Sequence, residues 1–422
     1  MRVFKFGGAS VKNAEAVKNV KRILQLHGKD NILVVVSAMD KTTNALEKVV
    51  NSYFSGNKEE AENNLIKVRE FHVNILNELF EDKNHPVYDL INNVFVEIEW
   101  VLDEDPGRDY GFLYDQIVSQ GEFLSTRIIS EYLNDNSVDN LWLDVRDCIK
   151  TDNSYREGKV EWNTTDHLIK SIVIPEFENG RSVIITQGFV GCTSENYNTT
   201  LGREGSDYTA AIFGHALDAE EVVIWKDVSG VYNADPKYFP EAEMIDALSY
   251  NETIELAFYG ASVIHPKTIK PLENKKIPLK VKSFVDPNKE GSVICFETNF
   301  SKPVPCFIYK RNQVLISVSA MDFSFIIEEN LSRIFQLFAA AHVKINLMQN
   351  SAISFSVCTD NDPYKIPDLI DNLQKEFRVL YNTDVDLLTI RHYTQEVLNK
   401  LTEGKEILLE QRSRNTVQVV MR

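Results

Sequence analysis

Two glycine-containing segments place charged side chains where a loop could meet a phosphate or a carboxylate. The first, KFGG, contains Lys5 followed by Gly7 and Gly8 at the end of the apolar run Val3–Phe6. Adjacent glycines let the backbone approach a ligand closely, and free N–H groups at the start of a following helix favour phosphate. On its own, such a pair is more often a tight turn than a phosphate site.

The second segment, TTLGREGSD, precedes a predicted helix and contains Arg203 between Gly202 and Gly205. Such a loop can aim backbone N–H groups and one guanidinium at an anion. Helix capping by Ser206 or Asp207 accounts for those two residues, but it does not account for an arginine between glycines. This segment is therefore the strongest single indication of an anion site.

Thr43 and Glu122 are candidates for contacts with a small substrate. Thr43 follows the apolar run Ile32–Val36 and could cap the next helix or donate its hydroxyl to a carboxylate. Glu122 stands beside Gly121 in an otherwise helical stretch. A glycine there lowers helix stability by about 1 kcal/mol, which indicates a close approach of another group, and the glutamate could hold an ammonium. Capping alone is the simpler role for Thr43, and a solvated surface glutamate accounts for Glu122 equally well.

The loop after the run Val222–Trp225 could bind a nucleotide. Tyr232 could stack on a base and Lys237 could neutralise phosphate, while Asp235 and Pro236 favour a turn in either case. The chain contains neither G-x-x-x-x-G-K-[ST] nor G-x-G-x-x-G. The sequence therefore excludes a P-loop and the usual dinucleotide fingerprint.

The elements that must position these residues are short apolar runs separated by helical stretches such as Ala14–Leu26. The runs are continuous rather than alternating, which is typical of parallel strands covered on both faces. The pattern predicts an α/β fold with a mostly parallel sheet sandwiched by helices. Ligands bind at the carboxyl ends of the strands in such sheets, so we expect the candidate loops to share one site. The predicted strands are Val3–Phe6, Ile32–Val36, Ser182–Ile185, Val222–Trp225, Leu279–Val281 and Val293–Phe296.

The chain divides into three predicted parts. Residues 1–296 form the catalytic domain, with a helical insertion at about 45–133 that could be part of a lid over the substrate. Residues 297–312 contain two prolines and are predicted to be a stiff linker. Residues 313–422 show the β-α-β-β-α-β order of a ferredoxin-like module, followed by an incomplete or interleaved second one.

Composition limits the partners. The formal net charge of −17 disfavours nucleic acid and anionic membranes, and an anionic substrate would need a locally positive site. Five cysteines without a C-x-x-C pair indicate reduced, intracellular thiols. There is no apolar leader at the start and no run of the roughly 18 apolar residues that span a membrane. We therefore expect a cytoplasmic enzyme.

Six ordered motifs, KFGGAS, SAMDKTTN, SQGEFLS, TTLGREGSDYTAA, VSGVYNADPK and GASVIHPKT, resemble those of aspartate kinases. The resemblance covers essentially the whole chain, and the C-terminal region looks like the ACT regulatory domains of that family. It implies the amino-acid-kinase fold for the first domain. It also implies ATP-dependent phosphorylation of the L-aspartate side-chain carboxylate to 4-phospho-L-aspartate and ADP, the first step towards lysine, threonine and methionine. The implied cofactors are ATP and Mg²⁺, with the ion held mainly by ATP rather than by protein ligands.

The resemblance also implies roles for individual residues. Those at the catalytic centre would be Lys5, Gly8 and Asp207. Those around the aspartate would be Ser37, Thr43, Glu122, Arg203 and Ser206. Those around the ATP would be Lys5, Gly7, Gly8, Ser10, Lys226, Asp227, Tyr232, Lys237, Ser262 and Val263.

Three positions depart from the commoner pattern of the family. Glu204 stands where glycine is usual, Lys226 where threonine is usual, and Ser262 where lysine often occurs. Lys226 could supply the charge that is missing at Ser262. These departures leave the details of nucleotide binding open.

The C-terminal region carries no catalytic constellation, so it is either a dimerisation module or an amino-acid sensor. The resemblance favours feedback inhibition by lysine or threonine and a homodimer or higher homo-oligomer. A fused homoserine dehydrogenase is not expected. The candidate effector residues are Met321, Ser324, Asn346, Gln349 and Ser351.

Two other functions compete with this one. A kinase for glutamate or acetylglutamate would share the fold but lack the double ACT tail and the pair of motifs GREGSD and VYNADP. A non-catalytic amino-acid-binding regulator is motivated by Glu204 and Ser262. The retention of Lys5, Glu122 and Arg203, together with Asp207, argues against the regulator.

Overall fold

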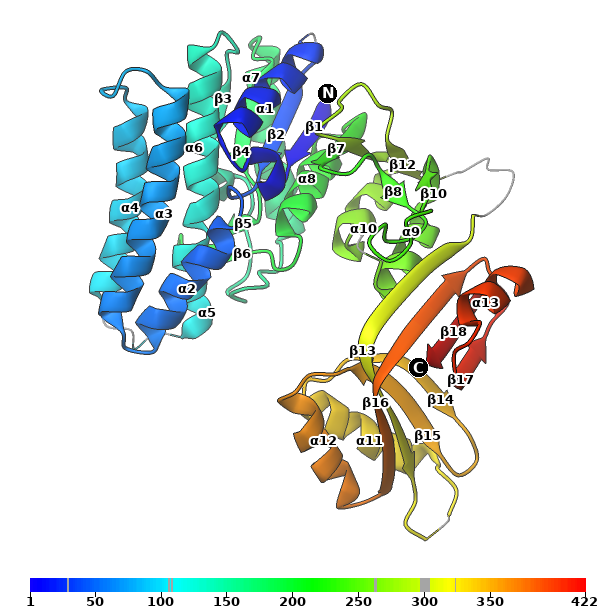
Figure 1. The fold of residues 1–422 in the computed structure, drawn as a ribbon. Coiled ribbons are helices and arrows are strands. Elements are labelled where there is room, and N and C mark those ends of the chain that lie inside the picture. The colour runs from blue at the N-terminus through cyan, green and yellow to red at the C-terminus, as the bar shows by residue number, and fades with distance from the viewer. Residues whose placement is uncertain (29, 105–106, 108, 262–263, 297–303, 323) are drawn as a thin grey trace. The chain divides into compact units, whose positions relative to one another are not determined.

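The computed structural model describes residues 1–422 except 29, 105–106, 108, 262–263, 297–303 and 323 (Figure 1). Within the described part, no helix is both long and apolar enough to cross a membrane. The chain forms two compact units, and each is built from more than one segment. The first consists of Met1–Val231, Asp246–Ile254 and Val263–Asn299, and the second of Tyr232–Ile245, Glu255–Ser262 and Phe300–Arg422.

The first unit is organised around an eight-stranded sheet with the order β10-β12-β11-β7-β1-β2-β4-β3. Neighbouring strands in it are parallel, except that β11 and β12 are antiparallel. This confirms the predicted mostly parallel sheet. The strands are β1 (Arg2–Phe6), β2 (Ile32–Val36), β3 (Leu141–Leu143), β4 (Val183–Gln187), β7 (Glu221–Lys226), β10 (Ala247–Ser249), β11 (Leu279–Ser283) and β12 (Ser292–Cys295).

The central strands are buried on both faces, as their continuous apolar sequences predict. Every residue of β2 is buried, and Phe4 and Phe6 of β1 pack their rings against Trp225 of β7. Helix α8 packs against β1, β2 and β7, and α6 packs against β2, β3 and β4. The helices of the sheet region are α1 (Ala14–Leu26), α7 (Trp162–Glu178), α8 (Gly205–Ala216) and α10 (Pro266–Lys275). Helix α9 (Tyr250–Tyr259) contains the boundary between the two units.

Helices fill the segment that was predicted to be a helical insertion after the second strand. In Figure 1, α3, α4 and α6 lie side by side beyond the edge of the sheet that ends in β3. Helix α6 belongs to both groups, because it also covers the sheet, and it connects the insertion to the strands. The helices are α2 (Thr42–Phe54), α3 (Lys58–Leu79), α4 (Val87–Asp103), α5 (Tyr110–Val118) and α6 (Gln120–Asp135).

Two small two-stranded sheets contain the remaining strands described before residue 297. The strands β5 (Val190–Cys192) and β6 (Asn198–Thr200) pair antiparallel directly before α8. The strands β8 (Val231–Tyr232) and β9 (Met244–Ile245) form a separate two-stranded sheet. The first hairpin matters for function, because it leads into the segment that contains Arg203.

The second unit contains a six-stranded antiparallel sheet with the order β14-β15-β13-β16-β18-β17. Its order along the chain is β13, α11, β14, β15, α12, β16, α13, β17 and β18, which begins with the predicted β-α-β-β-α-β pattern. The elements are β13 (Cys306–Ser319), α11 (Glu328–Ala340), β14 (Ile345–Asn350), β15 (Phe355–Asp360), α12 (Lys365–Gln374), β16 (Arg378–Arg391), α13 (Gln395–Thr402), β17 (Ile407–Arg412) and β18 (Thr416–Met421).

Strands β13 and β16 are each 14 residues long and pair with each other along most of their length. The second half of β13 also pairs with β15, whereas the second half of β16 pairs with β18. The register of the β13–β16 ladder shifts between Lys310 and Leu315. One continuous pair of strands therefore serves both halves of the sheet.

The structure corrects part of the predicted linker at 297–312. Strand β13 already begins at Cys306, so residues 306–312 are strand rather than linker. Pro305 lies directly before the strand, a position that proline tolerates because its missing N–H is not needed there. The division into residues 1–296 and 313–422 otherwise stays a proposal.

Candidate active site

A cavity of about 760 Å³ lies in the first unit, and most of the predicted substrate and catalytic residues line it. They come from the ends of β1, β2 and β7, from the starts of α2, α6 and α8, and from the loop after β6. The structure therefore brings together segments more than 200 residues apart in sequence. The predicted residues that line the cavity are Lys5, Ser37, Thr43, Glu122, Arg203, Ser206, Asp207 and Lys226.

An ion pair between Lys5 and Asp207 lies in the wall of this cavity. Lys5 Nζ is 2.6 Å from Asp207 Oδ1, and the side chains are only 10% and 4% exposed. The approach lacks hydrogen-bond geometry at Oδ1, so the contact is electrostatic rather than a directed hydrogen bond. Side chains alternate along β1, and Lys5 therefore points to the opposite face from Phe4 and Phe6. That face is the one covered by α8, whose first turn carries Asp207.

Gly7 and Gly8 are confined by their neighbours. A Cβ at Gly7 would lie 3.1 Å from Lys5 Nζ. A Cβ at Gly8 would lie 2.8 Å and 2.9 Å from the carbonyl oxygens of Ala38 and Asp40. The loop after β1 thus packs against the backbone of the loop after β2 at position 8, where only glycine fits. Ser10 is buried, and its hydroxyl donates to the carbonyl of Trp225 at 3.1 Å.

Glu122 is a buried carboxyl group in the first turn of α6. The N–H of Ala38 donates to Glu122 Oε1 at 3.2 Å. Its other oxygen, Oε2, is buried and has no hydrogen-bond partner among the described residues. Burial raises the pKa of Glu122 to about 8, although the Ala38 hydrogen bond and the charge of Lys5 act in the opposite direction. An unsatisfied carboxyl oxygen at a cavity wall is suited to receive a donor from a ligand.

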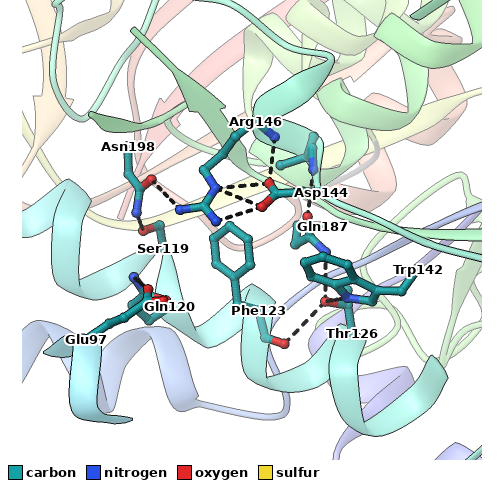
Figure 2. A network of polar contacts seen from close by, with 11 residues as sticks. Glu97, Ser119, Gln120, Phe123, Thr126, Trp142, Asp144, Arg146, Gln187 and Asn198 are labelled. Carbon is teal, nitrogen blue, oxygen red and sulfur yellow. Dashed lines mark hydrogen bonds and ion pairs between the residues drawn. The ribbon is translucent and has the colours of Figure 1, made fainter. Parts of the chain in front are cut away.

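A polar network fixes the start of α6, where Glu122 lies (Figure 2). The Thr126 hydroxyl donates to the Glu122 carbonyl at 2.8 Å and accepts from Gln187 at 2.9 Å and from Trp142 at 3.1 Å. Gln187 of β4 also accepts the N–H of Val145 at 2.8 Å. The helix is therefore connected to the sheet through one fully used hydroxyl group.

The other half of this network ties the same helix to the β5–β6 hairpin. The guanidinium of Arg146 lies over the ring of Phe123 and donates to both carboxylate oxygens of Asp144, from Nε to Oδ1 and from NH2 to Oδ2 (Figure 2). Its remaining NH1 donates to Asn198 at 3.4 Å, and Asn198 donates to Ser119 at 2.9 Å. These contacts hold the first turn of α6 and the hairpin in one fixed arrangement.

Three residues of the cavity wall have left-handed backbones although they are not glycine. They are Arg156 (φ 69°), Phe189 (φ 68°) and Glu204 (φ 53°). Such conformations cost on the order of 1–3 kcal/mol each and cluster at functional sites. Glu204, one of the three positions noted above in the sequence, directly precedes α8, and its carboxylate accepts the N–H of His265 at 2.8 Å. This hydrogen bond connects the start of α8 to the start of α10.

Asp115 is a buried residue that joins three segments next to the cavity. Its Oδ2 accepts the N–H groups of Arg156 and Thr200, each at 2.9 Å, and its Oδ1 accepts the Thr200 hydroxyl at 2.7 Å. Burial raises the pKa of Asp115 to about 7, and these hydrogen bonds counteract the rise. A single carboxyl group of α5 therefore sets the position of two loops.

Several cavity residues were missed by the sequence analysis. Their side chains reach the cavity through contacts between distant segments, and no motif in the sequence marks them. The available signal was Asp115, an acidic residue in the same predicted helical stretch as Glu122. Its hydrogen bonds position two of the missed residues, Arg156 and Thr200. The missed lining residues are Tyr114, Arg156, Glu157, Phe189 and Thr200.

The predicted nucleotide residues are placed only in part. Lys226 lines the cavity, whereas Asp227 is exposed at the end of β7. Tyr232 and Lys237 belong to the second unit, so their assignment stays a prediction. The two remaining residues of that set lie outside the described residues: Ser262 and Val263.

Of the candidate effector residues, Asn346 has its side chain occupied by the protein. Its amide oxygen accepts from Lys310 at 2.9 Å, and its amide nitrogen donates to Gln313 at 2.8 Å and to Asp360 at 3.0 Å. An effector would have to displace one of these contacts to bind this amide. The other candidates are exposed, and they are Met321, Ser324, Gln349 and Ser351.

Comparisons with known proteins agree with this geometry. The model of the amino acid kinase family matches residues 1–283. The chain is 31% identical to the lysine-sensitive aspartokinase 3 of Escherichia coli (strain K12), over 85% of this chain and 78% of that protein. The structure of E. coli aspartokinase III in complex with lysine and aspartate matches with a TM-score of 0.83 and 26% identity, over 100% of this chain and 95% of the other. The complex of that enzyme with aspartate and ADP matches with a TM-score of 0.81 and 26% identity, over 100% and 96%.

The fold, the strand-end cavity and the length of these matches agree with one another. The chain belongs to the amino acid kinase family and, within that family, to the aspartokinases.

Proposed function

We propose that this protein transfers the γ-phosphoryl group of ATP to the side-chain carboxylate of L-aspartate, giving 4-phospho-L-aspartate and ADP. The observation that carries the proposal is the cavity in which the Lys5–Asp207 pair, Arg203 and the buried Glu122 occur together. The similarity to a structure solved with aspartate and ADP supports the same substrates.

The chemistry needs charge neutralisation more than proton transfer. The aspartate side chain has a pKa of about 4 and is ionised at neutral pH, so no general base is required. The obstacle to attack by this carboxylate is the negative charge of the γ-phosphate. Two unit charges about 4 Å apart repel by about 4 kcal/mol at an effective dielectric near 20. Lys5 offsets this repulsion and stabilises the charge that builds up on the transferred group. Asp207 holds the Lys5 ammonium at the required position.

The remaining cavity residues orient the amino acid. Glu122 pairs its free carboxyl oxygen with the substrate ammonium, and Arg203 binds the α-carboxylate through two parallel hydrogen bonds. Ser37, Thr43 and Ser206 provide hydroxyl groups around the same ligand. With its ammonium at Glu122 and its α-carboxylate at Arg203, the substrate would direct its side-chain carboxylate towards Lys5.

The nucleotide approaches from the side of the two glycines. The tight fit of Gly7 and Gly8 beside Lys5 leaves backbone rather than side chain next to the phosphate. Bound Mg²⁺ would neutralise phosphate charge, and ATP oxygens and water would supply most of its ligands. Lys226, Asp227, Tyr232 and Lys237, with Ser262 and Val263, complete the proposed ATP contacts.

A hydroxamate assay tests the function directly, because hydroxylamine traps acyl phosphates. The protein is incubated with ATP, Mg²⁺ and, in separate reactions, aspartate, glutamate or acetylglutamate. Aspartate alone should give product above background. Product from glutamate or acetylglutamate instead would favour the neighbouring kinases, and no product from any acid would favour a non-catalytic regulator.

Replacing Lys5 by alanine should lower kcat by about 100-fold or more, because its charge acts mainly in the transition state. The Kd of ATP should change much less. Steady-state kinetics and nucleotide titration measure the two effects, and Lys12→Ala, which removes an exposed lysine nearby, serves as the control. Near-normal turnover in the Lys5 variant would remove Lys5 from the centre.

Replacing Arg203 by lysine keeps a positive charge but loses the bidentate hydrogen bonding of the guanidinium. The KM for aspartate should rise about 10-fold or more, since hydrogen bonds to charged groups contribute about 1.5–3 kcal/mol. The KM for ATP should change little. An unchanged KM for aspartate in the same kinetic series contradicts the assignment of Arg203.

Binding of aspartate should release a proton from Glu122. Because its pKa rises on folding from an ordinary 4.5 to about 8, the group stays largely protonated near pH 7, and its ionisation makes folding less favourable as the pH rises between those values. The substrate ammonium pairs with the ionised form. Calorimetry in buffers of different ionisation enthalpy should detect most of one proton released near pH 7 and almost none above about pH 9. Glu122→Gln should abolish the release, and persistence of the release in that variant would assign it elsewhere.

We also propose that the second unit carries a feedback site for lysine or threonine and joins two copies of the chain. The exposed candidates Met321, Ser324, Gln349 and Ser351 would line this site, and the cytoplasm is the proposed location of the protein. The relative solved with bound lysine supports an amino-acid effector.

One of the two amino acids should inhibit the hydroxamate reaction with a saturating dose response. The measurement is an inhibition curve for each amino acid at an aspartate concentration near KM. A flat response to both amino acids would leave the unit with a dimerisation role only.

A further inference from the structure

Arg156 lines the same cavity as Lys5 and Arg203, but neither its sequence context nor the proposed mechanism gives it a role. It lies in the loop between the bridged residues Thr151 and Val160. Its backbone is left-handed, with φ at 69°, a conformation that glycine would adopt without strain. The chain therefore keeps a long charged side chain at a cavity-lining position where glycine is the unstrained choice.

The surrounding structure forces this conformation. Asp115 accepts the N–H of Arg156 at 2.9 Å, and the N–H of Gly158 donates to the carbonyl of Thr200 at 2.8 Å. On the other side, a Cβ at Gly202 would lie 3.3 Å from the Arg156 carbonyl oxygen. The Arg156 loop and the segment that leads into Arg203 are thus one packed unit.

The guanidinium of Arg156 is oriented by two aromatic rings. Its central carbon lies 4.7 Å from the ring centre of Tyr114 and 5.4 Å from that of Tyr110. Among the described residues, no carboxylate forms an ion pair with this guanidinium, and no side chain or carbonyl accepts from it. Contacts with ring faces leave the N–H groups of the guanidinium without a conventional acceptor in the described part of the chain, and these groups match a carboxylate bidentately.

We propose that Arg156 is a further substrate-binding residue, whose guanidinium binds a carboxylate of the amino acid in the cavity and selects for a substrate with two carboxylates. This inference rests on the proposed function. The ligand chemistry is that of an oxyanion, and a phosphate of the nucleotide shares it. The carboxylate is favoured because Asp115 joins the Arg156 loop to Thr200, three residues before Arg203, so that both guanidinium groups belong to one rigid frame.

The left-handed backbone makes a sharp test available. If Arg156 served only to shape the loop, glycine would do so with less strain, and Arg156→Gly would leave both stability and binding intact. If Arg156 binds substrate, the same variant should keep or raise Tm while the affinity for aspartate falls. The two roles therefore predict the same effect on stability and different effects on binding.

The experiment uses the full chain and compares the wild type with Arg156→Gly, Arg156→Lys and a control, Lys276→Gly. Lys276 is also an exposed cation with a left-handed backbone (φ 58°), but it directly follows α10 as its C-cap and does not line the cavity. Calorimetric titration with aspartate gives Kd without turnover, and kinetics give the KM of aspartate and of ATP. For Arg156→Gly we expect Kd and KM for aspartate to rise about 10-fold, with a change of about twofold or less in the KM of ATP. Arg156→Lys should lie between, and Lys276→Gly should bind as the wild type does.

Three outcomes would overturn the inference. An aspartate Kd within about twofold of wild type in a folded Arg156→Gly protein assigns the residue to loop structure. A rise confined to the KM of ATP assigns it to the nucleotide phosphate. A rise of the aspartate Kd in Lys276→Gly as large as in Arg156→Gly attributes the effect to a general change in the fold. Failure of the proposed function is separate, because it shows in the wild type as no hydroxamate from aspartate, while the titration still compares the variants.

Discussion

The buried ion pair between Lys5 and Asp207 is the interaction on which the rest of the site depends. Removing charges from water is costly, and a buried pair is stable only when its geometry is fixed and its neighbours supply further polar contacts. Here the strand β1 and the first turn of α8 fix the two ends, and the protein carries a net charge of −17 around them. The ammonium of Lys5 is held in a fixed position, where anionic reactants can bind to it. Its ion pair with Asp207 prevents it from pairing with another acidic side chain. The tight glycines after β1 and the packing of α8 on the sheet follow from the need to bring these two residues together.

Three strained backbones lie in the wall of the same cavity and are held by hydrogen bonds from outside it. Arg156, Phe189 and Glu204 keep left-handed backbones because the segments on either side of them are fixed. Asp115 provides the most connected of these anchors, and His265 provides another through Glu204. A wall built from strained residues on a rigid support is pre-organised, so little binding energy is lost in ordering it. The strain lowers the free energy of unfolding, and the burial of the apolar sheet beneath the cavity offsets this loss.

Local pattern predicted the fold class, and local pattern together with the family resemblance predicted about half of the cavity wall; the resemblance alone implied Ser37 and Lys226. Glu122 and Arg203 were found because each is adjacent to a glycine near the start of a helix, and Lys5 because it shortly precedes a pair of glycines at the end of a strand. Parallel strands bring their carboxyl ends to one edge. Arg156 was not found, since its place depends on a hydrogen bond to Asp115, 41 residues away. The strand at 306–312 was missed for a similar reason: its pairing partner is the second half of β16, about 80 residues later in the chain. Local sequence marks the ends of elements, whereas contacts between distant segments decide which side chains share a cavity.

The two long strands of the second unit have a consequence for how that unit can be divided. Because β13 and β16 each run through both halves of the sheet, neither half consists only of strands of its own. A cut placed in either strand would expose unpaired backbone on both sides of the cut, and an inserted residue would shift the pleat for every side chain beyond it. Grafting one half onto another enzyme would therefore have to carry both strands entire, and the smallest transferable piece is the complete six-stranded sheet with its helices.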